Sequence, residues 1–171
     1  PNTLCTVTVT ASGVEDQDVP VMNMQFDYVF SFTTAALRIH DIQGAGHTSP
    51  YVNQAVTGIP GIVTGILSNG FYMQDSSPDG TDATSEGILV FTGAAGAKPS
   101  LGAAVTVSGW VSEYRDSGRP NDLTLTEMGS NGAVILSWTL VSSGNSLPSP
   151  VVIGSPAACG AVNRMPPMEN I

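Results

Sequence analysis

The chain has 171 residues, of which 42% are hydrophobic and 11% are charged. A disordered chain would carry more charge and less apolar material, so this composition predicts a folded protein. Fourteen acidic residues against five basic ones give a net charge of −9. This balance excludes a general electrostatic attraction to nucleic acid or to anionic membranes. Apolar runs are too short to span a bilayer, so we expect no membrane insertion.

The first segment, residues 1–36, shows two strand-like patterns. Residues 6–10 alternate Thr and Val, and residues 28–33 alternate in the same way with aromatic side chains. A polar, turn-prone stretch at residues 13–18 separates them. The segment resembles the last hairpin of an immunoglobulin-like sandwich from bacterial surface proteins. Because two strands are not stable alone, we expect a β-hairpin that packs on the next domain or on a neighbouring chain, as a remnant or an assembly arm.

Residues 37–141 predict one all-β domain. After a connector at residues 35–50, a long apolar run at residues 54–67 contains Pro60 and several glycines, so this first strand must bend or bulge. Asn69-Gly70 predicts a tight hairpin into the second strand. Further strands are expected at residues 71–74, 87–92, 105–114 and 123–126, with a sixth at residues 134–141.

Five strands, with the first long and joined to the second by a tight hairpin, are typical of an OB-fold barrel. The stretch between the third and fourth strands, residues 93–104, is rich in Gly and Ala and holds Pro99, so it favours at most one helical turn. Residues 142–171 are rich in proline and predict an extended tail or linker. The predicted fold class is therefore an all-β, five-stranded OB-fold barrel with an N-terminal β-hairpin and an extended Pro-rich C-terminal tail.

A family resemblance rests on several collinear motifs between Ile39 and Met128. They are Ile39-His40-Asp41-Ile42-Gln43-Gly44, Asn69-Gly70-Phe71-Tyr72-Met73-Gln74-Asp75, Ala83-Thr84-Ser85-Glu86-Gly87-Ile88, Val105-Thr106-Val107-Ser108-Gly109 and Val111-Ser112-Glu113-Tyr114. Together they resemble the OB-fold module that precedes the catalytic domain in bacterial extracellular nucleases of the endonuclease/exonuclease/phosphatase superfamily. Two departures are Pro60 inside the first strand and Gly102-Ala103-Ala104 before the fourth. We find no counterpart of that family's catalytic residues and expect no enzyme.

The resemblance implies single-stranded nucleic acid as a partner, with DNA favoured over RNA. OB-folds bind single strands by stacking bases on aromatic side chains, with cations along the groove. The candidate stacking residues are Tyr72, Phe91, Trp110 and Tyr114, and the candidate cations are Arg115 and Arg119. The alternative for each aromatic is a place in the core.

An acidic loop at residues 75–86 suggests a cation. Its carboxylates belong to Asp75, Asp79, Asp82 and Glu86, and closely spaced oxygen ligands suit Ca²⁺. The alternative is a solvated turn with local hydrogen bonds. His40, Asp41 and His47 are candidates for ligation or acid/base chemistry, but they favour hydrogen bonds that join the connector to the barrel.

The two cysteines, Cys5 and Cys159, lie near opposite ends of the chain. The acidic, Lys-poor composition is common in secreted bacterial proteins, so we expect an extracellular protein. Because the chain begins at Pro1 we expect a processed or excised piece. In that setting the cysteines predict a disulfide, within one chain or between two.

Two functions follow from these patterns. The first is a non-catalytic, extracellular module that binds single-stranded nucleic acid. The second is a structural module that assembles into a homo-oligomer, polymer or filament by strand addition through its terminal segments. The net charge favours the second function, and the OB-fold resemblance favours the first.

Overall fold

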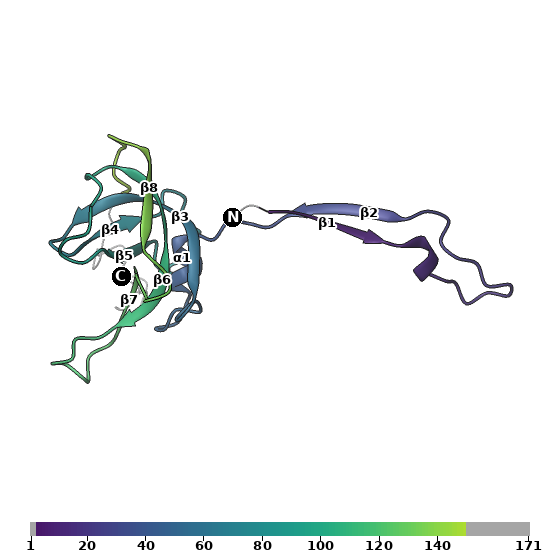
Figure 1. The fold of residues 1–171 in the computed structure, drawn as a ribbon, viewed down its shortest axis with the longest axis horizontal. Coiled ribbons are helices and arrows are strands. Elements are labelled where there is room, and N and C mark those ends of the chain that lie inside the picture. Colours follow the sequence, from purple (N-terminus) through teal and green to yellow (C-terminus); the bar gives the residue numbers. More distant parts are fainter. Residues whose placement is uncertain (1–2, 150–171) are drawn as a thin grey trace, which may run out of the picture. The chain divides into compact units, whose positions relative to one another are not determined.

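The computed structural model describes residues 3–149, and the chain divides into two compact units between Ala36 and Leu37. The first unit is an antiparallel ribbon of β1 (Leu4–Val9) and β2 (Tyr28–Thr33), with a short 3-10 turn, η1 (Ala11–Gly13), after β1 (Figure 1). The predicted N-terminal hairpin is confirmed.

The second unit contains a closed barrel of five strands. They are β3 (Ala55–Ile66), β4 (Gly70–Gln74), β5 (Gly87–Phe91), β6 (Ala104–Tyr114) and β7 (Leu125–Gly129). The strand order is β3-β4-β5-β7-β6, and β6 closes the barrel by pairing with β3. Among the described strands, β5 and β7 pair in parallel and the other pairs are antiparallel. The predicted five-stranded OB-fold barrel is confirmed.

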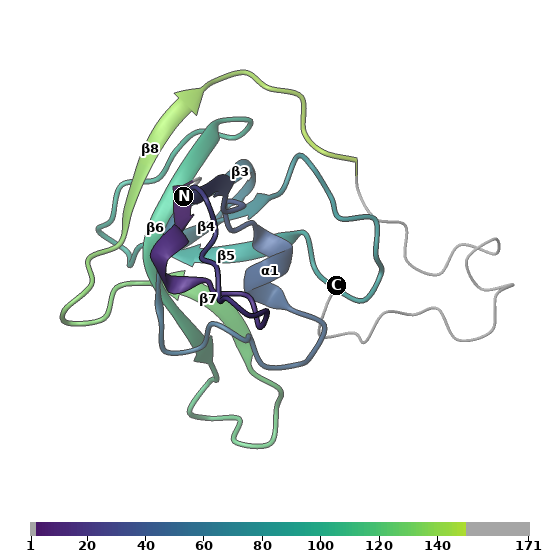
Figure 2. The ribbon, with the colours of Figure 1, turned by 90° about the vertical axis from the view of Figure 1, so that its right-hand side faces the viewer.

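A further strand, β8 (Ser137–Ser142), lies outside the barrel. It pairs with the first half of β6, whereas β7 pairs with the second half (Figure 2). The side chain of Asn145 then donates to the carbonyl of Gly102, at 2.9 Å, which fixes the chain just after β8. The rest of the predicted Pro-rich tail, residues 150–171, lies outside the described residues.

The long first strand bends as expected. Its pairing with β6 shifts register between Val56 and Ile59, and its pairing with β4 shifts between Val63 and Gly65. Gly58 lies in the first irregularity with a φ of +70°, a conformation that glycine adopts without strain. Residues 55–62 of β3 pair with β6, and residues 62–66 pair with β4.

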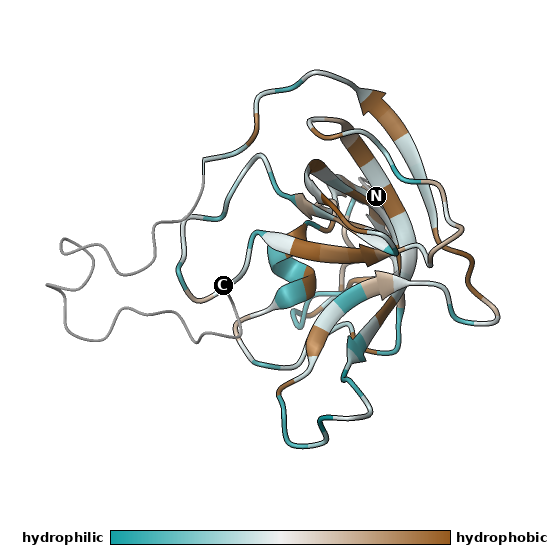
Figure 3. Cartoon of the chain, turned by 90° about the vertical axis from the view of Figure 1, so that its left-hand side faces the viewer, coloured by the Kyte–Doolittle hydropathy of each residue, from teal (hydrophilic) through white to brown (hydrophobic). Residues whose placement is uncertain are grey.

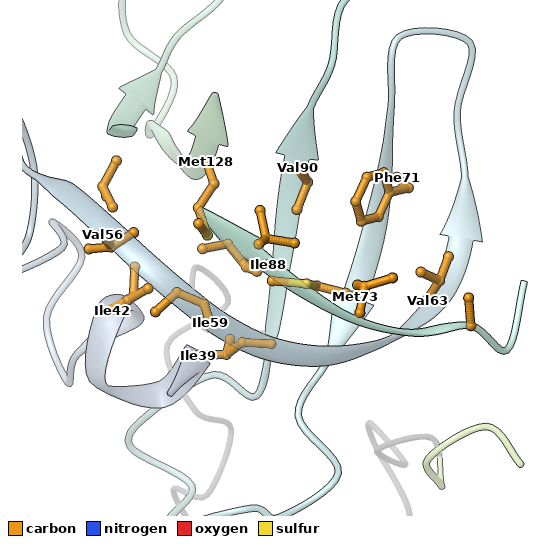
Figure 4. Close-up of a cluster of buried hydrophobic side chains, with 14 residues drawn as sticks. Ile39, Ile42, Val56, Ile59, Val63, Phe71, Met73, Ile88, Val90 and Met128 are labelled. Carbon is orange, nitrogen blue, oxygen red and sulfur yellow. The ribbon is translucent and has the colours of Figure 1, made fainter. Parts of the chain in front are cut away.

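The predicted connector contains a short helix, α1 (Ile39–Gln43). Ile39 and Ile42 lie three positions apart, so one turn of helix points both side chains the same way. Both are fully buried and join the cluster that holds Ile59 and Val56 (Figure 4). Between β5 and β6, residues 92–103 form turns, as the sequence predicts.

The barrel core follows the alternation of the strands. Inward positions of β6 are buried and outward ones are partly exposed, and Figure 3 shows hydrophobic and hydrophilic bands alternating along the strands. The fully buried side chains include Phe71, Met73, Val90, Val111 and Met128. Within residues 3–149, no helix has the length and apolar character needed to cross a membrane.

Candidate binding face and metal-ligand cluster

The outer face of β4, β5, β7 and β6 can be read from the strand register. Side chains of directly paired residues lie on the same face of a sheet. Tyr72 pairs with Leu89, Leu89 with Glu127, and Glu127 with Ser112. Since Tyr72 is 41% exposed while its neighbours on β4 are fully buried, this row faces outward.

A second row on the same face contains two of the predicted aromatic residues. Gly129 pairs with Trp110, and a side chain at Gly129 would touch the ring of Phe91. Phe91 and Trp110 therefore lie on either side of a glycine that leaves room between them. Tyr114, which pairs with Leu125, begins a third row, two residues beyond Ser112 of the first row along β6.

All four predicted stacking residues thus lie on one face. Tyr72, Phe91 and Tyr114 have exposed fractions of 41%, 40% and 53%, and Trp110 is partly exposed. The alternative, that these residues belong to the core, is wrong, because none of the four side chains is buried. The aromatic residue that β4 contributes to the core is Phe71. We name this surface, made by Tyr72, Leu89, Phe91, Trp110, Tyr114 and Glu127, the aromatic face.

Glu127 lies at the centre of the aromatic face and was not singled out by the sequence. It is 9% exposed. Burial raises the pKa of its carboxyl group above the ordinary value, and the hydrogen bond with Ser112 offsets part of that rise. The alternation of side chains along β7 predicts that Glu127 points outward, but nothing in the sequence predicts that its side chain is buried there.

The two predicted cations belong to the loop between β6 and β7. Arg115 donates to the carbonyl oxygen of Pro120 at 3.0 Å, and Arg119 pairs with Asp122 at 3.6 Å. Both members of the second pair are well exposed to solvent. The same loop also holds Asp116. Two arginines and two aspartates leave it without net charge, although OB-folds use this loop at the edge of their binding surface.

The acidic loop at residues 75–86 is anchored at its start. The Asp75 carboxylate forms a bidentate ion pair with the Arg38 guanidinium, and its Oδ2 accepts from Arg38 Nε at 2.8 Å. The hydrogen bond with Asp75 raises the pKa of Arg38. Asp75 also accepts from the backbone N–H of Ser77 at 2.8 Å and is 2% exposed. Both carboxylate oxygens of Asp75 are therefore bound to Arg38, the residue just before α1.

Two other residues of the predicted calcium set, Asp79 and Glu86, lie close to His40. Within residues 3–149, one group has the histidine and carboxylate ligand atoms that could hold a metal ion, and it consists of His40, Asp79 and Glu86. The ligand atoms lie within 4.8 Å of one another, and His40 Nδ1 is 3.1 Å from Glu86 Oε2. Asp75 and Asp82 are not members of this group. The calcium prediction remains a prediction.

Local hydrogen bonds position the two carboxylates. Asp79 accepts from Thr81 N at 2.8 Å through one oxygen and from Thr84 Oγ1 at 2.7 Å through the other. Glu86 Oε1 accepts from the backbone N–H of Asp79 at 2.8 Å. Burial acts to raise the pKa of Asp79, but these hydrogen bonds and the neighbouring His40 outweigh it, so the pKa is lowered.

His40 is the member contributed by α1. Its side chain is 14% exposed, and its Nε2 lies 4.0 Å from Asp41 Oδ2. Burial lowers the pKa of this imidazole, but the hydrogen bond with Glu86 and the charges of Glu86, Asp41 and Asp79 outweigh it and raise the pKa. The sequence analysis considers His40 and the acidic loop separately, because they are 35 residues or more apart in the chain.

His47 lies in a different set of contacts. Its Nε2 is 3.0 Å from Oγ1 of Thr124, the residue just before β7. Close along the chain, Ser49 N donates to Glu113 Oε1, which also accepts from Thr126 Oγ1, both at 2.9 Å. These hydrogen bonds join the segment after α1 to β6 and β7, the role that the sequence favours for this histidine.

The hairpin unit presents an aromatic row of its own. Tyr28, Phe30 and Phe32 lie on one face of β2, with ring centroids 5.9 and 6.5 Å apart. Their partners on β1 are Val9, Val7 and Cys5. Cys159, the predicted disulfide partner of Cys5, lies outside the described residues, so that disulfide remains a prediction.

Comparisons with models of protein families, with curated proteins and with solved structures gave no match.

Proposed function

We infer that the barrel is a non-catalytic module that binds single-stranded nucleic acid, DNA in preference to RNA, on its aromatic face. The observation that carries the proposal is the register, which brings Tyr72, Phe91, Trp110 and Tyr114 to the outer face of four adjacent strands. This is the face, with its flanking loops, on which OB-folds hold extended polymers. The resemblance to modules of secreted nucleases supports single-stranded nucleic acid as the ligand and an extracellular location.

Stacking is an interaction that this acidic protein can use. A base stacked on an aromatic side chain contributes about 1–3 kcal/mol, and the contribution does not depend on the net charge of the protein. Since Arg115 and Arg119 already have acidic or carbonyl partners, few phosphates are neutralised. We therefore expect modest affinity, slight sequence preference and a shallow dependence on salt.

The test is a titration of a short fluorescent oligothymidine at two salt concentrations. Trp110→Ala should weaken binding about fivefold or more, as expected for one lost stacking partner. The matched control is Phe26→Ala, which removes a ring that is 73% exposed in the hairpin unit and should leave binding unchanged. Equal binding by the two variants would contradict the proposal, as would no binding by the unaltered protein at low salt.

The hairpin supports the second candidate function, homo-oligomeric assembly. Every residue of β2 is exposed, and Phe30 and Phe32 are 43% and 49% exposed. A two-stranded ribbon with an apolar face is stabilised by strands from another subunit. Sedimentation over a range of protein concentrations tests this function. Phe30→Ser should shift the protein towards monomer, whereas a monomer at every concentration in the unaltered protein argues against assembly.

A further inference from the structure

We propose that His40, Asp79 and Glu86 form a binding site for a divalent transition-metal ion of the zinc or manganese class. The site is separate from the aromatic face, and the inference does not depend on nucleic-acid binding. Its ligands come from two parts of the chain, because α1 supplies the histidine and the loop before β5 supplies both carboxylates. The three ligand atoms lie within 4.8 Å of one another.

The kinds of donor atom decide which metals fit. Ca²⁺ takes about six to eight ligands, and these are oxygen atoms rather than imidazole nitrogens. One imidazole and two carboxylates suit zinc, which accepts nitrogen and oxygen ligands in a tetrahedral arrangement, and also suit manganese. Three protein ligands leave a coordination position for water or for an oxygen of another molecule. Asp75, another oxygen donor of the acidic loop, is already bound to Arg38.

The balance of charge also favours a cation. Glu86 Oε2 lies 3.1 Å from one nitrogen of the imidazole, and Asp41 Oδ2 lies 4.0 Å from the other. Asp79 is the third carboxylate beside the same ring. A single imidazolium would leave the three carboxylates with two uncompensated negative charges, whereas a divalent ion bound to the neutral imidazole leaves only one.

The structure holds the three groups in place before any ion binds. Asp79 is oriented by Thr81 N and Thr84 Oγ1, and Glu86 by the N–H of Asp79. The loop is closed at its base, where Asp75 N donates to the carbonyl oxygen of Glu86 at 2.8 Å. The Arg38–Asp75 ion pair ties the same point to the start of α1. His40 and Glu86 side chains are 14% and 16% exposed, so water has limited access to them.

The experiment uses the full chain after removal of metal ions with a chelator. Isothermal titration with Zn²⁺ should give one equivalent of binding, and Zn²⁺ should raise the melting temperature more than Ca²⁺ or Mg²⁺ does. Titration with Mn²⁺, followed by loss of the free-ion paramagnetic resonance signal, should show the same site with weaker affinity. Because Mn²⁺ binds thiols poorly, the second titration separates this site from Cys5 and Cys159.

Three variants locate the ion. Glu86→Gln, which keeps the side chain's shape, should weaken binding by roughly a hundredfold, because loss of a ligand costs more than loss of a supporting residue. Asp82→Asn is the matched control, since it removes a charge from the same loop outside the group. Thr84→Val removes a hydroxyl that only positions Asp79 and should weaken binding by about tenfold. It also provides the test if Glu86→Gln does not fold.

Four results would overturn the proposal. The first is the absence of both binding heat and thermal shift with Zn²⁺, and the second is a Ca²⁺ affinity that matches the Zn²⁺ affinity. The third is a loss of affinity in Asp82→Asn equal to that in Glu86→Gln. The fourth is Zn²⁺ binding that stays unchanged in both Glu86→Gln and Thr84→Val.

Discussion

The hairpin of residues 3–36 and the barrel of residues 37–149 are built from similar strands but treat their apolar side chains differently. Every residue of β2 (Tyr28–Thr33) is exposed, although its sequence alternates aromatic and small residues. In β6 (Ala104–Tyr114), alternate residues are buried. Phe30 is 43% exposed and Phe71 is fully buried.

This difference shows that alternation of apolar and polar residues predicts a strand but does not predict whether its apolar face is buried. Alternation indicates an extended strand with two unlike faces. Whether the apolar face is buried depends on a second layer or on closure of the sheet. In the barrel, closure through β3 and β6 and the side chains of α1 supply that layer. A two-stranded ribbon has no closure and no second layer, so the apolar face of β2 remains exposed.

The largest expected effect contrasts one phenylalanine from each unit. Phe71→Ala should lower the free energy of unfolding by about 3–5 kcal/mol, because it removes a fully buried ring and leaves a cavity. Phe32→Ala, at a side chain that is 49% exposed, should cost about 1 kcal/mol or less. Urea denaturation monitored by circular dichroism measures both. Similar losses would mean that the hairpin face is buried in solution.

A second contrast concerns charge. Arg38→Met leaves the Asp75 carboxylate, 2% exposed, without its partner and should cost about 3 kcal/mol. Arg119→Met removes an exposed pair with Asp122 and should cost less than about 1 kcal/mol. The same denaturation experiment compares the two. A double variant, Arg38→Met with Asp75→Leu, should recover part of the loss; no recovery would point to an effect other than the unpaired charge.

Much of the fold could be predicted from the sequence because it follows local rules. Asn69-Gly70 marks the first barrel hairpin, Pro60 marks a bulged strand, and Gly93 to Ala104 excludes a long helix. The helix α1 was missed because five residues carry too little periodicity. Its signal is the pair Ile39 and Ile42, two apolar residues three positions apart within a polar connector.

The candidate sites were harder to predict, for two physical reasons. The aromatic face could be foreseen because strand register follows from the fold. The cluster of His40 with Asp79 and Glu86 depends on how the acidic loop folds back on α1, and sequence separation conceals that contact. Asp75 shows the same limit, since nothing local indicates that its partner is Arg38.

A third prediction concerns Glu127, the acidic residue at the centre of the aromatic face. Its pKa is raised in the folded protein, so the neutral form favours folding; this stabilisation is complete below the ordinary pKa of 4.5 and is lost as pH rises through the raised value. Glu127→Gln should therefore raise the melting temperature near pH 8. The two proteins should melt alike near pH 3.5. A difference that does not change with pH would contradict this explanation.

The smallest effects are expected within the hairpin, where its two faces can be compared. Thr6 Oγ1 and Ser31 Oγ lie 2.9 Å apart on the face opposite the aromatic row. Thr6→Val keeps the side chain's shape and loses one exposed hydrogen bond, so its effect on stability should stay within about 0.5 kcal/mol. Phe30→Ser instead removes the central ring of the row, which contacts both of its neighbours.

Amide hydrogen exchange of residues 4–9 and 28–33 distinguishes the two substitutions. The exchange rates should hardly change in Thr6→Val and should rise in Phe30→Ser, because the ring packing that orders the ribbon is lost. If the aromatic row is an assembly surface, the rates in the unaltered protein should fall as its concentration rises, and those in Phe30→Ser should not. Exchange that is independent of concentration in both proteins would leave ring stacking within one chain as the source of the hairpin's order, and would remove the support that the hairpin gives to assembly.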